Sequence, residues 1–180
     1  MKRRFLVIGE LGAQLTLARN VPSQYRHSLG GILRFARALQ GRGAKVFVAG
    51  ALGCDLLGDT SLLLAKEAGI NVGFVSRYPN FQTPLWVVDG QSCQQYGSTA
   101  PCLQSTIEQL NSMIHNVDAV FSCNAMTETS KRVLEQLCAE SQTKLCEYYA
   151  DPFTDHDALA KYHCELYGLS FEEERRSQTI

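Results

Sequence analysis

Residues 29–58 read LGGILRFARALQGRGAKVFVAGALGCDLLG, and this stretch decides the fold. The glycine pair Gly30 and Gly31 lets the backbone approach a ligand closely at the point where a helix can begin. Apolar residues recur after the pair at helical spacing, with arginines between them, which predicts an amphipathic helix. The Gly-Arg-Gly sequence of residues 41–43 is typical of the end of such a helix.

The second half of the stretch predicts a strand, a turn and another helix. Residues 45–50 (KVFVAG) are β-branched and aromatic in a run too short for a helix, which predicts a buried strand. A Gly-x-Asp-x-x-Gly turn follows at residues 53–58. Residues 59–68 then predict a helix, with Asp59 or Thr60 as its N-cap.

The rest of the chain continues this alternation. It predicts one α/β domain over residues 1–180, with a mostly parallel sheet and helices on both faces. Residues 11–25 predict an irregular segment or a second strand, and residues 166–169 a short last strand. Further strands are predicted at 5–9, 71–77, 83–89, 117–123 and 144–149, and further helices at 103–116, 127–141 and 155–163.

Residues 71–97 are an exception, because they contain strand patterns but no helix. The turn sequence at residues 89–92 (DGQS) lies between two of these strands and is typical of a hairpin. Strands without a helical crossover are usually antiparallel neighbours. We therefore expect residues 71–97 to form a small antiparallel β flap at one edge of the sheet.

Composition excludes several classes of protein. A net charge of -1, with 19% charged residues, argues against nucleic acid or an anionic membrane as a partner. No apolar run is long enough to span a bilayer. The seven cysteines are scattered singly, which favours reduced thiols in a cytoplasmic protein and no zinc site. Residues 155–157 (DHD) predict the start of a helix rather than a metal site.

Several segments together resemble one family. They are VIGE at residues 7–10, AGALGCDLLGD at 49–59, the flap sequence at 74–101, the strand and helix at 118–137, and YYADPF at 148–153. Their order is similar to that of the ribokinase-like (PfkB) family of sugar and nucleoside kinases. VFSCN, at residues 120–124, is similar to pseudouridine kinases within that family.

The resemblance implies a three-layer ribokinase-like fold, with ATP and magnesium as cofactors and a sugar, nucleoside or sugar phosphate as ligand. It also implies a flap that closes over the substrate and forms a homodimer. By their positions in the family motifs, five residues are assigned to substrate binding: Gln14, Gly30, Gly31, Arg34 and Asp55.

Two of these residues depart from the family pattern. Gln14 stands where the family has an aspartate, so it can form hydrogen bonds but not the charge-assisted ones. Arg34 stands where the family has an asparagine, and an arginine binds a phosphate or a carboxylate in place of a hydroxyl group.

The cofactor motifs depart further. The family's Asn-x-x-Glu element falls at residues 170–173, where Ser170 replaces the asparagine and only Glu173 matches, as a cofactor-binding residue. The second family signature, Asp-Thr-x-Gly-Ala-Gly-Asp, is absent from this sequence. In the family it supplies the catalytic base and the anion hole. We therefore expect a degenerate kinase, truncated at the C-terminus, with no catalytic residue and no activity alone.

Other interpretations remain open. The chain is alternatively a non-catalytic module that binds a small ligand or a protein partner, or a fragment without a stable function. A second copy or a partner is expected to cover the truncated side. Gly30 and Gly31 alternatively form only a tight turn, Asp55 caps the residues after it, and Arg34 is solvated. Trp86 either stacks on a ligand or anchors a dimer.

Overall fold

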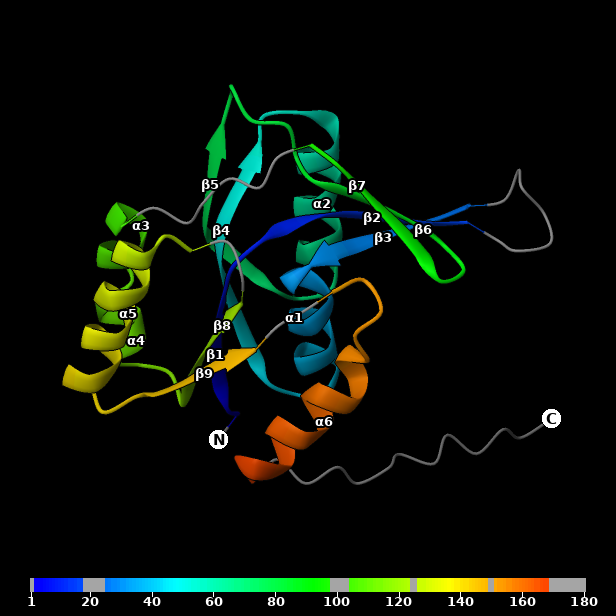
Figure 1. Ribbon diagram of the computed structural model, residues 1–180. Coiled ribbons are helices and arrows are strands. Elements are labelled where there is room, and N and C mark those ends of the chain that lie inside the picture. The colour runs from blue at the N-terminus through cyan, green and yellow to red at the C-terminus, as the bar shows by residue number, and fades with distance from the viewer. Residues whose placement is uncertain (1, 18–24, 98–103, 124–125, 149–150, 169–180) are drawn as a thin grey trace, which may run out of the picture.

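A computed structural model of the protein describes residues 2–17, 25–97, 104–123, 126–148 and 151–168. Its centre is a five-stranded sheet in which all neighbouring strands are parallel (Figure 1). The strand order across this main sheet is β5 (Asn71–Tyr78), β4 (Lys45–Gly53), β1 (Arg4–Ile8), β8 (Ala119–Cys123) and β9 (Lys144–Tyr148).

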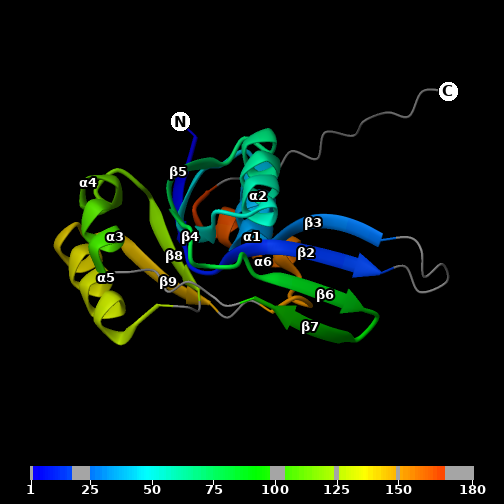
Figure 2. The same cartoon turned by 90° about the horizontal axis from the view of Figure 1, so that it is seen from above.

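Helices cover both faces of the main sheet, as Figure 2 shows from above. One face carries α1 (Ile32–Gly41), α2 (Leu56–Glu67) and α6 (His156–Leu166). The other carries α3 (Gln104–Gln109), α4 (Asn111–Ile114) and α5 (Glu128–Glu140). The three-layer α/β fold expected from the sequence is thus confirmed.

The central strand β1 explains why the sheet needs helices on both sides. Phe5 and Val7 pack into the core beneath α1 and α6, whereas Leu6 and Ile8 pack into the core beneath α3, α4 and α5. Successive side chains of a strand point to opposite faces, so a continuous apolar run is stable only when both faces are covered.

A second, smaller sheet projects from the carboxyl ends of the main strands (Figure 1). We call it the small sheet. Its order is β3 (Tyr25–Gly31), β2 (Leu11–Leu17), β6 (Leu85–Asp89) and β7 (Ser92–Tyr96). The β2–β3 and β6–β7 pairs are antiparallel, and the β2–β6 pair is parallel, so the small sheet is mixed.

The small sheet differs from the expected flap of residues 71–97. Strand β5 does not belong to it, because helix α2 provides a crossover from β4 and places β5 parallel to β4 in the main sheet. The other half of the small sheet comes instead from β2 and β3. The hairpin expected around residues 89–92 is confirmed, because β6 and β7 pair antiparallel across that turn. The extent expected for the flap, residues 71–97, is wrong, because β5 lies in the main sheet and β2 and β3 belong to the small sheet.

Three helix boundaries also differ from the expectation. Helix α2 begins at Leu56, because Asp55 rather than Asp59 or Thr60 is its N-cap. The helix expected at residues 103–116 is divided at Leu110 into α3 and α4. Residues 166–168 end α6 and do not form a strand. Within the described ranges, no helix is both long enough and apolar enough to cross a bilayer.

Candidate functional site

A cavity of about 280 Å³ lies where the small sheet meets the carboxyl ends of the main strands. Cys123, the last residue of β8, and Glu10, just after β1, both line it. Ligands of open α/β sheets bind at this edge, beyond the carboxyl ends of the strands. The polar residues of its wall are Glu10, Gln14, Arg34, Gln95, Asp151 and His156.

Gln14 and Arg34 meet at the wall of this cavity. Gln14 lies on β2 and is only 7% exposed, and Arg34 is half-buried in the first turn of α1. Arg34 donates hydrogen bonds from Nη1 to Oε1 of Gln14 at 3.1 Å and to the carbonyl oxygen of Pro152 at 2.6 Å. Two residues proposed from the family positions therefore lie together, and Arg34 is not a solvated helix residue.

The charge of Arg34 lies in a partly buried place beside two carboxylates. Desolvation by burial lowers the pKa of its guanidinium, and the carboxylates of Asp157 and Asp151 only partly oppose that effect. None of the ion pairs found among the described residues includes Arg34. The wall of the cavity thus contains a cation that no described carboxylate contacts directly.

His156, which the sequence did not suggest as a site residue, is also part of this wall. Its side chain is 5% exposed, and its Nδ1 is buried without a hydrogen-bond partner among the described residues. Burial, followed by the nearby charge of Arg34, lowers the pKa of His156 to about 4, although three aspartates oppose the shift. The imidazole is therefore neutral near pH 7.

A signal for His156 does exist in the sequence. His156, Ala160 and Cys164 are the buried residues of α6, and they recur every four positions. This spacing puts His156 on the apolar face of the helix rather than among its solvated acids. The prediction for residues 155–157 considered only the start of the helix and not its buried face, so it did not identify His156.

The glycine pair has a packing role that the structure makes explicit. A Cβ added to Gly30 would lie 2.6 Å from Cε3 of Trp86, and one added to Gly31 would lie 2.2 Å from the carbonyl oxygen of Glu10. Gly31 also has a φ of 57°, in the left-handed region. Gly31 lines the cavity, whereas Gly30 lies beside it against Trp86.

Trp86 is part of the cavity wall and only 7% exposed. Its ring lies against Gly12 on the neighbouring strand β2 and against Gly30 on β3, the strand beyond it. The interpretation of Trp86 as an exposed anchor of a dimer is therefore wrong, since almost no ring surface is left for a second chain.

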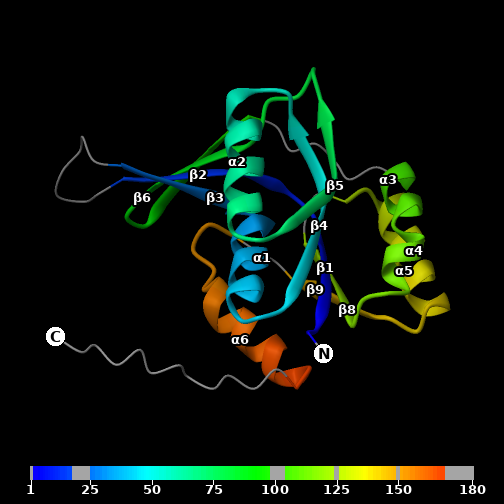
Figure 3. The same ribbon diagram turned by 180° about the vertical axis from the view of Figure 1, so that it is seen from behind.

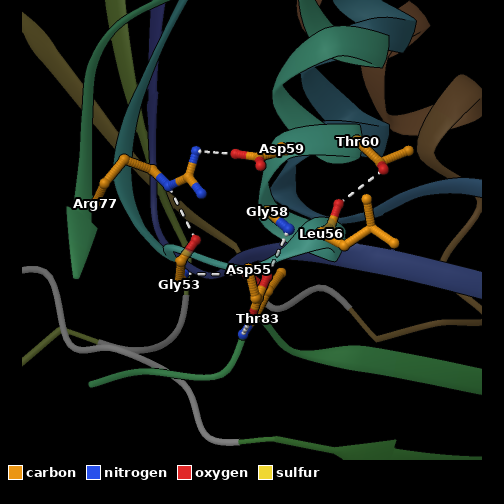
Figure 4. Close-up of polar contacts among 8 residues, drawn as sticks. All are labelled: Gly53, Asp55, Leu56, Gly58, Asp59, Thr60, Arg77 and Thr83. Carbon is orange, nitrogen blue, oxygen red and sulfur yellow. Dashed lines mark hydrogen bonds and ion pairs between the residues drawn. The ribbon is translucent and has the colours of Figure 1, made fainter. Parts of the chain in front are cut away.

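Asp55 lies outside the cavity and has a structural role (Figure 4). Its Oδ1 accepts a hydrogen bond from the amide of Gly58 at 2.7 Å, and its Oδ2 accepts one from the amide of Thr83 at 2.7 Å. Burial raises the pKa of this carboxyl, but the bonds from Thr83 and Gly58, with the charge of Arg77, outweigh burial and lower it overall. Asp55 therefore joins the start of α2 to the segment before β6.

The same corner is held by Arg77. Its Nε donates to the carbonyl oxygen of Gly53 at 2.9 Å, and its Nη1 forms an ion pair with Asp59 at 2.8 Å (Figure 4). These contacts close the turn of residues 53–58 over the end of β4.

A larger hollow of about 1220 Å³ lies along the outer side of α1. Gln14, Arg34 and His156 belong to the walls of both spaces. The hollow runs between α1, α2 and the start of α6, which lie together on one side of the main sheet, the left side in Figure 3.

The expected cofactor residue cannot be placed. Glu173, like Ser170 and Asn124, lies outside the described residues. Within the ranges that are described, no three His, Cys, Asp or Glu side chains are grouped as a metal ion requires.

No protein-family model matches the chain, and no curated protein matches its sequence. Its fold is nevertheless that of the PfkB and ribokinase type of carbohydrate kinase. A PfkB protein from a Polaromonas species superposes with a TM-score of 0.67 at 16% identity, covering 81% of this chain and 54% of that one.

Two further solved structures are similar. A fructokinase with bound ATP from Xylella fastidiosa gives a TM-score of 0.65 at 20% identity, covering 86% of this chain and 50% of that one. Ribokinase from Arabidopsis thaliana, complexed with ribose and ATP, gives 0.60 at 14% identity, covering 82% and 53%. The chain thus spans about half the length of these proteins, and at such identities the likeness shows the fold alone.

Proposed function

We propose that this chain binds a small polyhydroxylated ligand, a sugar or a nucleoside, in the cavity at the carboxyl ends of the main strands. The observation that carries the proposal is that Gln14, Arg34 and Trp86 all line this one cavity. A volume of about 280 Å³ is at the small end of ligand pockets, which suits a ligand of monosaccharide size.

The chemistry of the wall supports such a ligand. Carboxylates of Glu10 and Asp151 accept hydrogen bonds, the guanidinium of Arg34 donates them, and the amides of Gln14 and Gln95 do both. Trp86 also lines the cavity, but with only 7% of its surface exposed it adds a small apolar area and not a stacking face. A polyol needs this mixture, because each hydroxyl group is both a donor and an acceptor.

We further propose that the chain alone binds without transferring phosphate. Phosphoryl transfer needs the donor, the metal and the acceptor to be positioned together. The Asp-Thr-x-Gly-Ala-Gly-Asp sequence, to which the family resemblance assigns that role, is absent from this sequence. ATP and magnesium would then have no complete site on this chain, and the similarity to pseudouridine kinases would concern ancestry rather than activity.

The competing proposal is an interaction module that pairs through the small sheet. Strand β7 is an outer strand, and Tyr96 at its end is 53% exposed. An outer strand with free backbone groups can pair with a second copy or with a partner.

None of the six cysteines in the described ranges forms a disulfide, which supports a cytoplasmic location.

The test uses the purified chain and two neighbouring variants. Ligands of the native state raise its melting temperature, so ribose, fructose, adenosine, pseudouridine and their phosphates are screened by thermal shift. Gln95→Ala removes a cavity residue, whereas Gln94→Ala, one residue away on the opposite face of β7, is the matched control.

We expect a shift with at least one compound, which Gln95→Ala weakens and Gln94→Ala does not. An assay of phosphate transfer from ATP should show no turnover above background. Absence of any shift, together with a concentration-dependent dimer in size-exclusion chromatography, would favour the interaction module instead.

A further inference from the structure

One guanidinium edge of Arg34 lacks a partner in the part of the chain that the structure describes. Its Nη1 is occupied, because it donates both to Gln14 and to the carbonyl oxygen of Pro152. No hydrogen bond or ion pair of Nε or Nη2 is found with any described residue. These two nitrogens carry parallel N–H groups, the geometry that binds a carboxylate or a phosphate with two hydrogen bonds.

The two hydrogen bonds of Nη1 also fix the orientation of the guanidinium group, and with it the direction of the Nε–Nη2 edge. Gln14 holds the guanidinium from β2, and Pro152 holds it from the segment before α6. A side chain held at two points loses little further freedom when a ligand binds. Arg34 is thus arranged in advance in the wall of the cavity.

His156 is a second group without a partner in the same wall. Its side chain is only 5% exposed. Its Nδ1 is buried, and no hydrogen bond of the ring is found among the described residues. A buried polar group left without a hydrogen bond is costly, so it favours a partner that the described residues do not supply. The imidazole lines the cavity together with Arg34.

The acidic groups of the cavity are already engaged. Asp151 accepts a hydrogen bond from the amide of Phe153 at 2.7 Å, and Glu10 accepts one from Nε2 of Gln95 at 3.0 Å. Neither forms an ion pair with Arg34. Asp157 and Asp151 offset only part of the cost of burying the charge of Arg34, and none of the ion pairs found among the described residues includes it.

We propose that the ligand of this cavity is an anionic sugar derivative, whose carboxylate or phosphate binds the Nε–Nη2 edge of Arg34 beside His156. This inference rests on the proposed function and narrows it. Hydroxyl groups at the other end of the ligand would bind Glu10 and Gln95. A neutral sugar would bind more weakly, because its hydroxyl groups carry no charge that attracts the guanidinium and cannot form the bidentate pair that a carboxylate or a phosphate forms with it.

Trp86 makes the test specific to this site. It is the one tryptophan of the sequence and lines the cavity, so its fluorescence reports occupancy directly. The probes are D-glucose, D-gluconate and the terminal phosphate ester of D-glucose, together with D-ribose, D-ribonate and the terminal phosphate ester of D-ribose. Within each set the carbon skeleton is constant and only the charged group changes.

Three variants accompany the wild-type protein. Arg34→Gln removes the charge, and Arg34→Lys keeps the charge but cannot form bidentate hydrogen bonds. Arg37→Gln, one turn along the same helix and exposed, removes an equal charge away from the cavity and is the control. Melting temperatures of all variants are measured first, so that loss of folding is distinguished from loss of binding.

We expect at least one acid or phosphate to bind about tenfold or more tightly than its neutral parent. Arg34→Gln should abolish that preference, Arg34→Lys should reduce it, and Arg37→Gln should leave it unchanged. Whether the acid or the phosphate binds more tightly identifies the anionic group. Equal or tighter binding of a neutral parent would overturn this inference while leaving the proposed function intact. No binding of any of these six probes would also overturn this inference, whereas the proposed function fails only if the wider thermal-shift screen gives no shift as well.

Discussion

Arg34 on α1 donates a hydrogen bond from Nη1 to Oε1 of Gln14 on β2, across 3.1 Å. The same nitrogen donates to the carbonyl oxygen of Pro152, which lies just before α6. One guanidinium therefore connects the small sheet, the first helix and the segment that leads into the last helix. These three parts, together with the carboxyl ends of β1 and β8, enclose the cavity.

The coupling between Arg34 and Gln14 is measurable by a double-mutant cycle. We expect an interaction free energy of about 0.5–1.5 kcal/mol for Arg34→Ala combined with Gln14→Ala, because the pair shares one partly buried hydrogen bond. Urea unfolding of the four proteins gives this value. A cycle of Arg37→Ala with Gln14→Ala should give a value near zero, and an equal coupling in both cycles would contradict the contact.

Alanine at Gly30 or Gly31 should destabilise the protein strongly, by about 3 kcal/mol or more. A Cβ at Gly30 would collide with Trp86 and the backbone of Ala13, and one at Gly31 would collide with the carbonyl oxygen of Glu10. Gly41 is the matched control, since a Cβ there meets no atom within 4 Å at the end of α1. Gly41→Ala should stabilise by about 0.4–1 kcal/mol. Equal effects at Gly30 and Gly41 would refute the packing argument.

Asp55→Ala should lower the free energy of unfolding by about 2–4 kcal/mol. The substitution removes the cap of α2 and leaves the amide of Thr83 without its acceptor. Asp59→Ala removes only an ion pair whose carboxylate is largely exposed, so it should cost less than about 1 kcal/mol.

The effect of Asp55 should also depend on pH. Its folded-state pKa lies below the ordinary value of 3.8, so its contribution is complete above that value and is lost as pH falls through the lower folded pKa. The difference between wild type and Asp55→Ala in chemical denaturation should therefore shrink in acid. A difference that stays constant down to pH 2 would exclude a charged acceptor.

His156 should make the protein less stable in mild acid. Its folded pKa of about 4 lies below the ordinary value of 6.5, so the unfolded chain takes up the proton first as pH falls. The contribution is complete above pH 6.5 and is lost between 6.5 and about 4, with a slope of up to about 1.4 kcal/mol per pH unit.

His156→Gln isolates this effect. The lowered pKa of His163, caused by burial and by Lys144, acts in the same direction and is present in both proteins. Melting temperatures measured across this pH range should fall more steeply for wild type than for the variant. Parallel curves would show that His156 is not buried in its neutral form.

Local sequence predicted much of the fold. The start of α1 after Gly31, the helices that begin near Thr127 and Asp155, and the turn at Gly90 are each formed by neighbours in the chain. The candidate site was only partly predictable. Gln14 and Arg34 were suggested by their positions in a family pattern, whereas His156 was missed.

The sequence by itself determined most of the strands and helices of the main sheet and that both faces of this sheet are covered. Apolar periodicity and capping act over a few residues, so a linear pattern contains them. Tertiary structure alone decided that β5 joins the main sheet, that Trp86 is buried, and that Asp55 binds Thr83. It also brought His156 beside Arg34. Each of these depends on partners far apart in the chain, and their approach is set by packing of the whole core, which no local pattern encodes.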